Sequence, residues 1–164
     1  MAIEIERRFL VRVDDALLRT AAVTPLRQGY LTVRDTTTVR IRQEGDAWVL
    51  AIKAEAGGIA RHEIELPVPP EDGRTLLGLA AGGTVEKTRH VVGRWEIDVY
   101  EGRYQGLVMA EVELDAEDES LPEMPAGLEL VREITYETGL SSRGLAALDD
   151  ASARALVARL TGAT

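Results

Sequence analysis

The 164-residue sequence contains no cysteine, and aromatic residues make up only 4% of it. Without cysteine the chain can form neither disulfides nor thiolate metal sites, which fits a reducing compartment. The N-terminus shows no apolar segment typical of a secretion signal, and no long uncharged apolar run occurs elsewhere. We therefore expect a cytoplasmic protein that makes no use of a membrane.

Basic residues are also scarce relative to acidic ones. The chain has 19 Lys and Arg against 28 Asp and Glu, a formal net charge of -9. Proteins that bind nucleic acid generally need Lys and Arg to neutralise phosphates, so we expect no nucleic-acid partner. Any phosphate-binding surface must therefore be confined to a part of the molecule where basic residues gather. The length and a hydrophobic content of 45% fit one folded domain over residues 1–164.

Alternation of apolar and polar residues runs through most of the chain and predicts strands with hairpin connections. Eight strands are predicted, at residues 3–11, 28–35, 38–43, 47–53, 61–68, 84–92, 94–100 and 106–114. Amphipathic helices are predicted at residues 14–22, 71–83 and 149–162, and an acidic loop at 115–125. The fold class is therefore α+β, built on a large antiparallel sheet or a closed barrel.

The polar faces of these strands are almost entirely charged. Alternation places Glu4, Glu6 and Arg8 on one face of the first strand. Thr, Ser and Gln, which are more usual on a solvated strand, are nearly absent from such positions. Eight acids and eight bases occupy these faces and sum to zero charge: Glu4, Glu6, Glu63, Glu65, Glu96, Asp98, Glu111 and Glu113, with Arg8, Arg40, Arg42, Lys53, Arg61, Lys87, Arg89 and Arg94.

The opposite faces are apolar and need cover, which the three helices can supply from outside a barrel. The charged faces then point inward. Buried charges without partners are costly, so this arrangement implies an ionic ligand in the interior. A polyphosphate with divalent metal fits both signs, because Lys and Arg bind phosphoryl oxygens and carboxylates hold Mg²⁺ or Mn²⁺.

Four pairs of acids stand two residues apart, close enough on one strand to share a metal. They are Glu4/Glu6, Glu63/Glu65, Glu96/Asp98 and Glu111/Glu113. One such pair is common on a solvated strand and indicates little. Together with Arg40-x-Arg42 and Lys87-x-Arg89, the four pairs indicate a site. His62, His90, Trp48 and Trp95 fall on the apolar faces and are predicted to pack rather than to bind ligand.

These motifs resemble the CYTH, or triphosphate tunnel metalloenzyme, superfamily. "EIERRFL" is similar to its opening E-x-E-x-K signature, and "VRIR", "AIK", "RHEIEL", "EKTRH", "WEIDVYEG" and "GLVMAEVEL" follow in the family's order. The resemblance covers about the whole chain. It implies an eight-stranded antiparallel closed barrel with helices packed outside. Two departures are Arg8 in place of the signature Lys, and Leu140 and Ser142 where many relatives have an aromatic residue and Asn.

The resemblance also implies roles for individual residues. Metal ligands are expected at Glu4, Glu6, Glu63, Glu65, Glu111 and Glu113, with Asp98 near the site. Triphosphate is expected to contact Arg8, Arg40, Arg42, Lys53, Lys87 and Arg89. Lys87, Glu4 and Glu6 are the expected catalytic residues. Whether the attacking water is activated by metal, by a Glu or by Lys87 is left open.

The function expected from these residues and this resemblance is metal-dependent hydrolysis of inorganic triphosphate to diphosphate and phosphate, by a monomer or homodimer. The alternatives are a class IV-type adenylyl cyclase, a thiamine triphosphatase and a non-catalytic polyphosphate-binding protein. The small number of aromatic residues favours a substrate without a base, because a base would find little to stack on. Retention of all four carboxylate pairs favours catalysis over binding alone.

Overall fold

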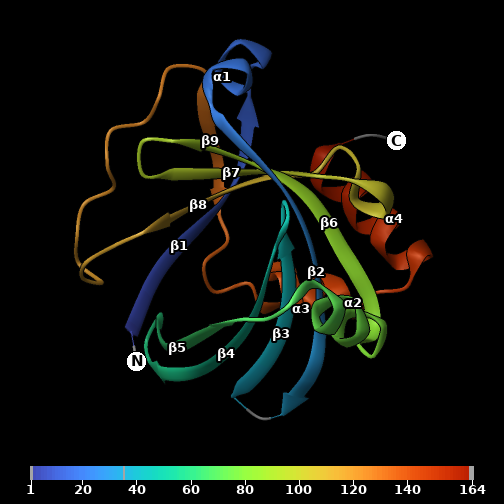
Figure 1. The fold of residues 1–164 in the computed structure, drawn as a ribbon. Coiled ribbons are helices and arrows are strands. Elements are labelled where there is room, and N and C mark those ends of the chain that lie inside the picture. The colour runs from blue at the N-terminus through green and yellow to red at the C-terminus, as the bar shows by residue number, and fades with distance from the viewer. Residues whose placement is uncertain (1, 35, 163–164) are drawn as a thin grey trace.

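The computed structural model describes residues 2–34 and 36–162, and its strands form one antiparallel sheet that curls into a barrel (Figure 1). The order of neighbours is β5-β4-β3-β2-β6-β7-β8-β1, and β1 pairs again with β5. This eight-stranded closed barrel confirms the predicted fold class. The strands are β1 (Ala2–Val13), β2 (Ala22–Arg34), β3 (Thr37–Glu44), β4 (Ala47–Gly57), β5 (Ala60–Pro67), β6 (Ala81–Val92), β7 (Trp95–Tyr100), β8 (Val108–Glu113) and β9 (Leu128–Glu133).

Strand β1 closes the barrel because it is long enough to serve three partners. One edge of β1 pairs with β8 through residues 6–10. The other edge pairs first with β5 through residues 2–5, and then with β9 through residues 9–13. The ninth strand therefore extends the sheet beside the barrel and is not one of the eight strands that close it.

The helices cover the outer apolar faces and one end of the barrel. They are α1 (Asp15–Thr20), α2 (Pro70–Gly78), α3 (Ser142–Ala146) and α4 (Asp150–Thr161). Capping residues mark their ends: Asp14 accepts a hydrogen bond from Leu17 N at the start of α1, and Gly162 ends α4 with a φ of 69°. No helix in the described residues is long and apolar enough to cross a bilayer.

The apolar residues gather into three clusters that separate the charged interior from the outside. Helix α2 covers Ile41 and Trp48 on the outer face of β3 and β4. Trp95 and Ile97 pack with β9 and α1, and Trp95 Nε1 donates to Glu123 O at 3.0 Å in the loop before β9. The third cluster joins barrel residues such as Met109 to the segment after β9 and to α4.

This third cluster limits the charged part of the interior. Leu10, Val85 and Met109 each stand two residues beyond a charged interior position on their strand, so they share its inward direction. They pack with Leu140 and Leu145, which follow β9 in the chain. The barrel interior is therefore divided into a charged section and an apolar layer next to it.

The close contact between α2 and the barrel allows a test of this packing. A Cβ added at Gly73 would lie 2.3 Å from the Trp48 ring, whereas one added at Gly78 of the same helix meets nothing within 4 Å. Gly73→Ala should lower the free energy of unfolding by about 1–3 kcal/mol through overpacking. Gly78→Ala should leave it unchanged or raise it by up to about 1 kcal/mol. Denaturant unfolding of both variants checks this, and equal effects would contradict the described packing.

Several elements differ from the sequence expectation. Strand β2 begins at Ala22 rather than near residue 28, because Pro25 and Gly29 are accommodated inside it. Helix α2 ends at Gly78, since the residues from Ala81 already belong to β6. The prediction contained neither β9 nor α3. Both depend on contacts with distant parts of the chain, β9 with the second half of β1 and α3 with β6 and β2.

Candidate active site

The inward-pointing charged residues line one cavity of about 710 Å³. Among the described residues, nine acids and nine bases line it, so its formal charge is zero. The acids are Glu4, Glu6, Glu55, Glu63, Glu65, Glu96, Glu111, Glu113 and Asp115. The bases are Arg8, Arg40, Arg42, Lys53, Arg61, Lys87, Arg89, Arg94 and Arg143. Apart from Asp98, every predicted site residue is in this set.

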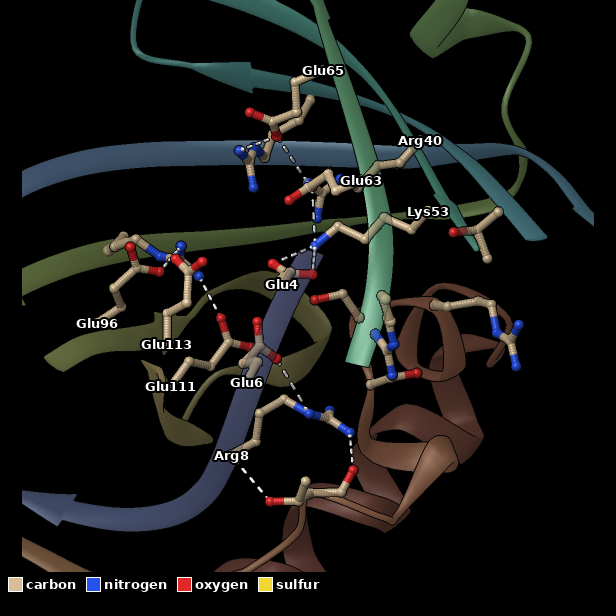
Figure 2. A pocket seen from close by; sticks show the side chains of 18 of the residues that line it. Glu4, Glu6, Arg8, Arg40, Lys53, Glu63, Glu65, Glu96, Glu111 and Glu113 are labelled. Atoms are coloured by element: carbon tan, nitrogen blue, oxygen red, sulfur yellow. Dashed lines mark hydrogen bonds and ion pairs between the residues drawn. The ribbon is translucent and has the colours of Figure 1, made fainter. Parts of the chain in front are cut away.

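Lys53 holds together acids from two strands that close the barrel (Figure 2). Its Nζ donates to the two oxygens of Glu4 on β1 at 2.8 and 2.7 Å, and lies 3.1 Å from Glu63 Oε1 on β5. Burial lowers the pKa of Lys53, but the nearby Glu4 and Glu6 outweigh burial and the neighbouring Arg40, so the pKa is raised. Lys53 therefore remains a cation on the cavity wall.

Arg40 and Arg42 line the cavity and carry buried donors without a partner, although Arg42 Nη2 pairs with Glu44 and Glu65. Arg40 Nη2 approaches Glu63 and Glu65 only to 3.9 and 3.7 Å, which is too far for hydrogen bonding. Arg40 Nε and Nη2, together with Arg42 Nε, are buried without a hydrogen-bond partner. Burial and the neighbouring Arg40 lower the pKa of Arg42. Two adjacent guanidinium groups with free donors form an arrangement suited to an anion rich in oxygen.

Asp98 lies beneath the cavity rather than on it. It is fully buried, and its carboxylate accepts from Lys87 Nζ and from Arg89 Nε and Nη2, the last two at 2.7 Å. Arg89 Nη2 also donates to Glu111 at 2.7 Å. Burial lowers the pKa of Arg89, but the hydrogen bonds to Asp98 and the charge of Glu111 outweigh burial, so the pKa is raised. Asp98 thus orients two cations of the cavity, and its oxygens are already in use.

Glu6, Glu111 and Glu113 form the most acid-rich part of the cavity. Glu6 stands opposite Glu113 in the β1–β8 pairing, and Glu111 stands opposite Arg8. Burial and the neighbouring Glu111 and Glu4 raise the pKa of Glu6 to about 8. For Glu111, burial is outweighed by Lys87 and Arg89, which lower its pKa to about 2. Among described residues Glu113 has no side-chain ion pair within 4 Å.

The chemistry of this acidic region fits a hard divalent cation. Its donors are carboxylate oxygens, which Mg²⁺ and Mn²⁺ prefer. The raised pKa of Glu6 reflects a carboxylate with too few cationic neighbours, which a divalent ion would supply. Within the described residues no group of three acidic or histidine side chains is already gathered closely enough to hold a metal. Mg²⁺ commonly takes one or two carboxylates and completes its shell with substrate phosphates and water, so such pre-assembly is not required.

Arg8 also lines the cavity, but its guanidinium points to backbone carbonyls. Its Nη1 donates to Leu140 O at 3.2 Å, and Nη2 donates to Thr135 O at 3.0 Å. Its Nε lies 3.5 Å from Glu6 Oε1. Figure 2 shows Arg8 between Glu6 and the segment after β9. This segment contributes a wall of the cavity in addition to the barrel strands.

The structure adds lining residues that the predicted site did not include. Alternation places Arg61 and Arg94 on the charged inward faces without giving them a site role, and both line the cavity. The wall after β9 contributes Thr135, Thr138, Ser141, Ser142 and Arg143. In the sequence, only the family comparison at Leu140 and Ser142 pointed to this segment, because its small polar residues form no pattern of their own.

The packing roles predicted for the aromatic and histidine residues agree with the structure. Trp48 and Trp95 lie in the outer apolar clusters. His90 Nδ1 is 3.2 Å from Leu18 O, and neither histidine lines the cavity. Tyr30 is the one aromatic side chain among the described lining residues. The cavity therefore offers many charges and little aromatic surface.

This geometry agrees with the family comparison. The model of the CYTH domain matches residues 2–147. The chain belongs to the CYTH family. The barrel with an inward charged surface that the CYTH resemblance implied is thus present, and this family of triphosphate tunnel enzymes is metal-dependent.

Named relatives are similar to this protein over most of the chain. An inorganic triphosphatase of Nitrosomonas europaea is 38% identical over 123 residues, covering 70% of this chain and 78% of the relative. An inorganic triphosphatase of Acetivibrio thermocellus is 34% identical over 123 residues, with 72% and 78% covered. A crystal structure of an inorganic triphosphatase superposes with a TM-score of 0.61 at 31% identity, covering 91% of this chain and 97% of that one.

Proposed function

We propose that this CYTH domain hydrolyses inorganic triphosphate to diphosphate and phosphate in its charged cavity, using Mg²⁺ or Mn²⁺. The observation that carries the proposal is the pair of buried guanidiniums, Arg40 and Arg42, whose free donors line a cavity rich in carboxylates. The similarity to named inorganic triphosphatases supports the same reaction. We expect no nucleic-acid partner, because the cavity has no excess of positive charge and the chain has a net charge of -9.

Five cations are proposed to bind the phosphoryl oxygens: Arg40, Arg42, Lys53, Lys87 and Arg89. They come from β3, β4 and β6 and surround the cavity, so they can contact successive phosphoryl groups of one chain. Positioned donors that stabilise charge on the transferring phosphoryl group supply most of the catalysis in phosphoryl transfer. Lys87, held by the buried Asp98, is the proposed catalytic cation.

Glu6, Glu111 and Glu113 are proposed to hold the metal, with Glu4, Glu63 and Glu65 acting as partners of Lys53, Arg40 and Arg42. When bound, the metal supplies a Lewis acid that neutralises charge on the phosphoryl oxygens. The zero formal charge of the cavity gives a separate reason for expecting that the reaction requires a metal ion. A cavity of zero formal charge offers a polyanion no net attraction, which an accompanying divalent cation would supply. The carboxylates of Glu4 and Glu6, which line the cavity, are proposed to orient the attacking water.

The substrate is proposed to lack a base. Tyr30 is the sole aromatic residue among the described lining residues, and it is 8% exposed. Recognition of adenine or thiamine generally needs an apolar slot with a few placed polar groups. We therefore expect a higher kcat/KM for inorganic triphosphate than for ATP or thiamine triphosphate.

Phosphate release from the three substrates, measured with Mg²⁺ and with Mn²⁺, tests this function. The proposal expects inorganic triphosphate to be hydrolysed fastest with at least one of the metals and expects no activity in excess EDTA. Equal or faster turnover of ATP would overturn the substrate assignment. Cyclic AMP among the products would indicate the cyclase instead, and binding without turnover of any substrate would indicate a polyphosphate-binding protein.

A further inference from the structure

Arg8 lies where the edge of β1 changes partner. Residues 2–5 of that edge pair with β5, and residues 9–13 pair with β9. Between these ladders the backbone of Arg8 continues the pairing with the residues after β9. Arg8 N donates to Thr135 Oγ1 at 3.1 Å, and Ile134 N donates to Arg8 O at 2.8 Å. The chain after β9 is thus attached to the barrel at this position.

The side chain of Arg8 strengthens the same attachment from inside the barrel. Nη2 reaches the carbonyls of Thr135 at 3.0 Å and Ile134 at 3.5 Å, while Nη1 reaches Leu140 O at 3.2 Å. The side chain is buried, with 6% of it exposed. One planar guanidinium therefore contacts carbonyls on both sides of the turn between β9 and α3.

Arg8 and Arg40 are matched in type and burial but differ in what their donors meet. Arg40 keeps Nε and Nη2 without partners. None of the Arg8 donors is among the buried groups that lack a partner: backbone carbonyls accept hydrogen bonds from Nη1 and Nη2, and Nε lies 3.5 Å from Glu6 Oε1. The donors of Arg89 are engaged too, but with carboxylates of the charged site, whereas the partners of Arg8 are mainly backbone carbonyls of a turn. The Arg8 guanidinium is therefore committed to that turn. Its charge and geometry instead stabilise a turn whose carbonyls would otherwise be buried and unpaired.

We propose that Arg8 is a positioning residue, which holds the wall formed by residues 134–146 against the cavity, rather than a direct ligand of the phosphate. This inference rests on the proposed triphosphate site. It differs from the phosphate contact that the family resemblance implies for this position. The wall brings Thr138, Ser141, Ser142 and Arg143 to the cavity, so the effect of Arg8 on substrate passes through them.

Arg143 is the residue of the wall best able to report this effect. It lies on α3, lines the cavity and is half-buried. Among described residues it makes no ion pair within 4 Å. A cation without an acidic partner beside the cavity can contact an anion there only while the wall is in place. Arg8 and Arg143 should therefore act as one unit.

Hydrogen exchange measures the positioning role without any substrate. The wall amides are bonded locally, for example Leu140 N to Glu137 O and Leu145 N to Ser141 O, both at 2.9 Å. In Arg8→Ala, exchange of amides 136–146 should accelerate by about 10- to 100-fold, the loss expected for a buried charge-assisted hydrogen bond. Arg40→Ala, the matched control, should leave exchange of these amides unchanged. Should Arg8→Ala fail to fold, exchange of the same amides is measured in Arg8→Lys. Exchange should accelerate there too, because one ammonium group cannot contact carbonyls on both sides of the turn as the guanidinium does.

A double-mutant cycle then tests how Arg8 affects the ligand. An imido-bridged triphosphate analogue with Mg²⁺ serves as a probe that is bound without turnover. Arg8→Ala and Arg143→Ala should each weaken binding, and the double variant should bind no more weakly than Arg8→Ala alone. Unchanged wall exchange in the Arg8 variants, additive losses of affinity, or wild-type affinity in Arg8→Lys would overturn the positioning role. Failure of the wild type to bind the analogue or hydrolyse triphosphate would instead overturn the proposed function, and the exchange result would still decide the role of Arg8.

Discussion

Replacing Arg40 with alanine is expected to lower kcat/KM for inorganic triphosphate by about 100- to 1,000-fold, the usual effect of losing a transition-state donor. The stability of the protein is expected to remain the same or to rise. Arg40 contributes little to the fold, because Nε and Nη2 are buried without hydrogen-bond partners. The carboxylates of Glu63 and Glu65 lie 3.9 and 3.7 Å from Nη2. A loss of activity with an unchanged melting temperature would thus separate a binding role from a structural one.

Two further variants sharpen this prediction. Arg40→Lys keeps the charge without the planar fork and should fall between the wild type and Arg40→Ala. Arg27→Ala removes an arginine outside the cavity, one that is half-exposed and 3.0 Å from Glu86, and should leave kcat/KM unchanged. Comparable losses in Arg27→Ala and Arg40→Ala, or full activity in Arg40→Ala, would show that the free guanidinium donors do not bind substrate.

Replacing Glu6 with glutamine should raise the Mg²⁺ concentration needed for half-maximal activity by about 10- to 100-fold. Cation affinity at oxygen sites depends strongly on the number of charged ligands, and Glu6 is a half-buried carboxylate with weak cationic pairing, 3.5 Å from Arg8 Nε. Folding should be retained, because a neutral amide of the same size is less costly to bury than a poorly paired charge. Activity measured against Mg²⁺ concentration checks the shift.

Glu55→Gln provides the matched control for the metal site. Glu55 lines the same cavity but is exposed and has no proposed ligand role. Its replacement should leave the Mg²⁺ dependence unchanged. If Glu6→Gln behaved like Glu55→Gln, or if the wild-type protein stayed active in excess EDTA, the proposed metal site would be wrong.

The sequence predicted the barrel and most of the cavity because both follow from the alternation of side chains between the two faces of a strand. Once the apolar faces of the strands are known, the charged faces must point the other way, and closure brings them together. Glu4, Arg40 and Lys87 therefore reach the cavity as expected. Strand β9 lay beyond this logic, because its partner is the second half of β1 and no hairpin connects them.

Alternation fixes the direction of a side chain but not its partner. Asp98 has the same parity as Glu96, yet it is buried beneath Lys87 and Arg89 while Glu96 lines the cavity. Arg8 likewise points inward as expected, but its contacts are set by the wall after β9. The Arg8 contacts join residues more than a hundred positions apart, and the Asp98 contacts depend on the complete burial of its carboxylate. No local pattern in a single sequence encodes either feature.

Product analysis by ³¹P NMR tests the central claim most directly. Inorganic triphosphate or ATP is incubated with the wild-type protein and with Arg40→Ala, in Mg²⁺ and in Mn²⁺. In at least one of these metals, the wild type is predicted to convert inorganic triphosphate to equal amounts of diphosphate and phosphate, faster than it consumes ATP, and Arg40→Ala is predicted to do so at a small fraction of that rate. No conversion of triphosphate in either metal, or faster consumption of ATP, would contradict the account.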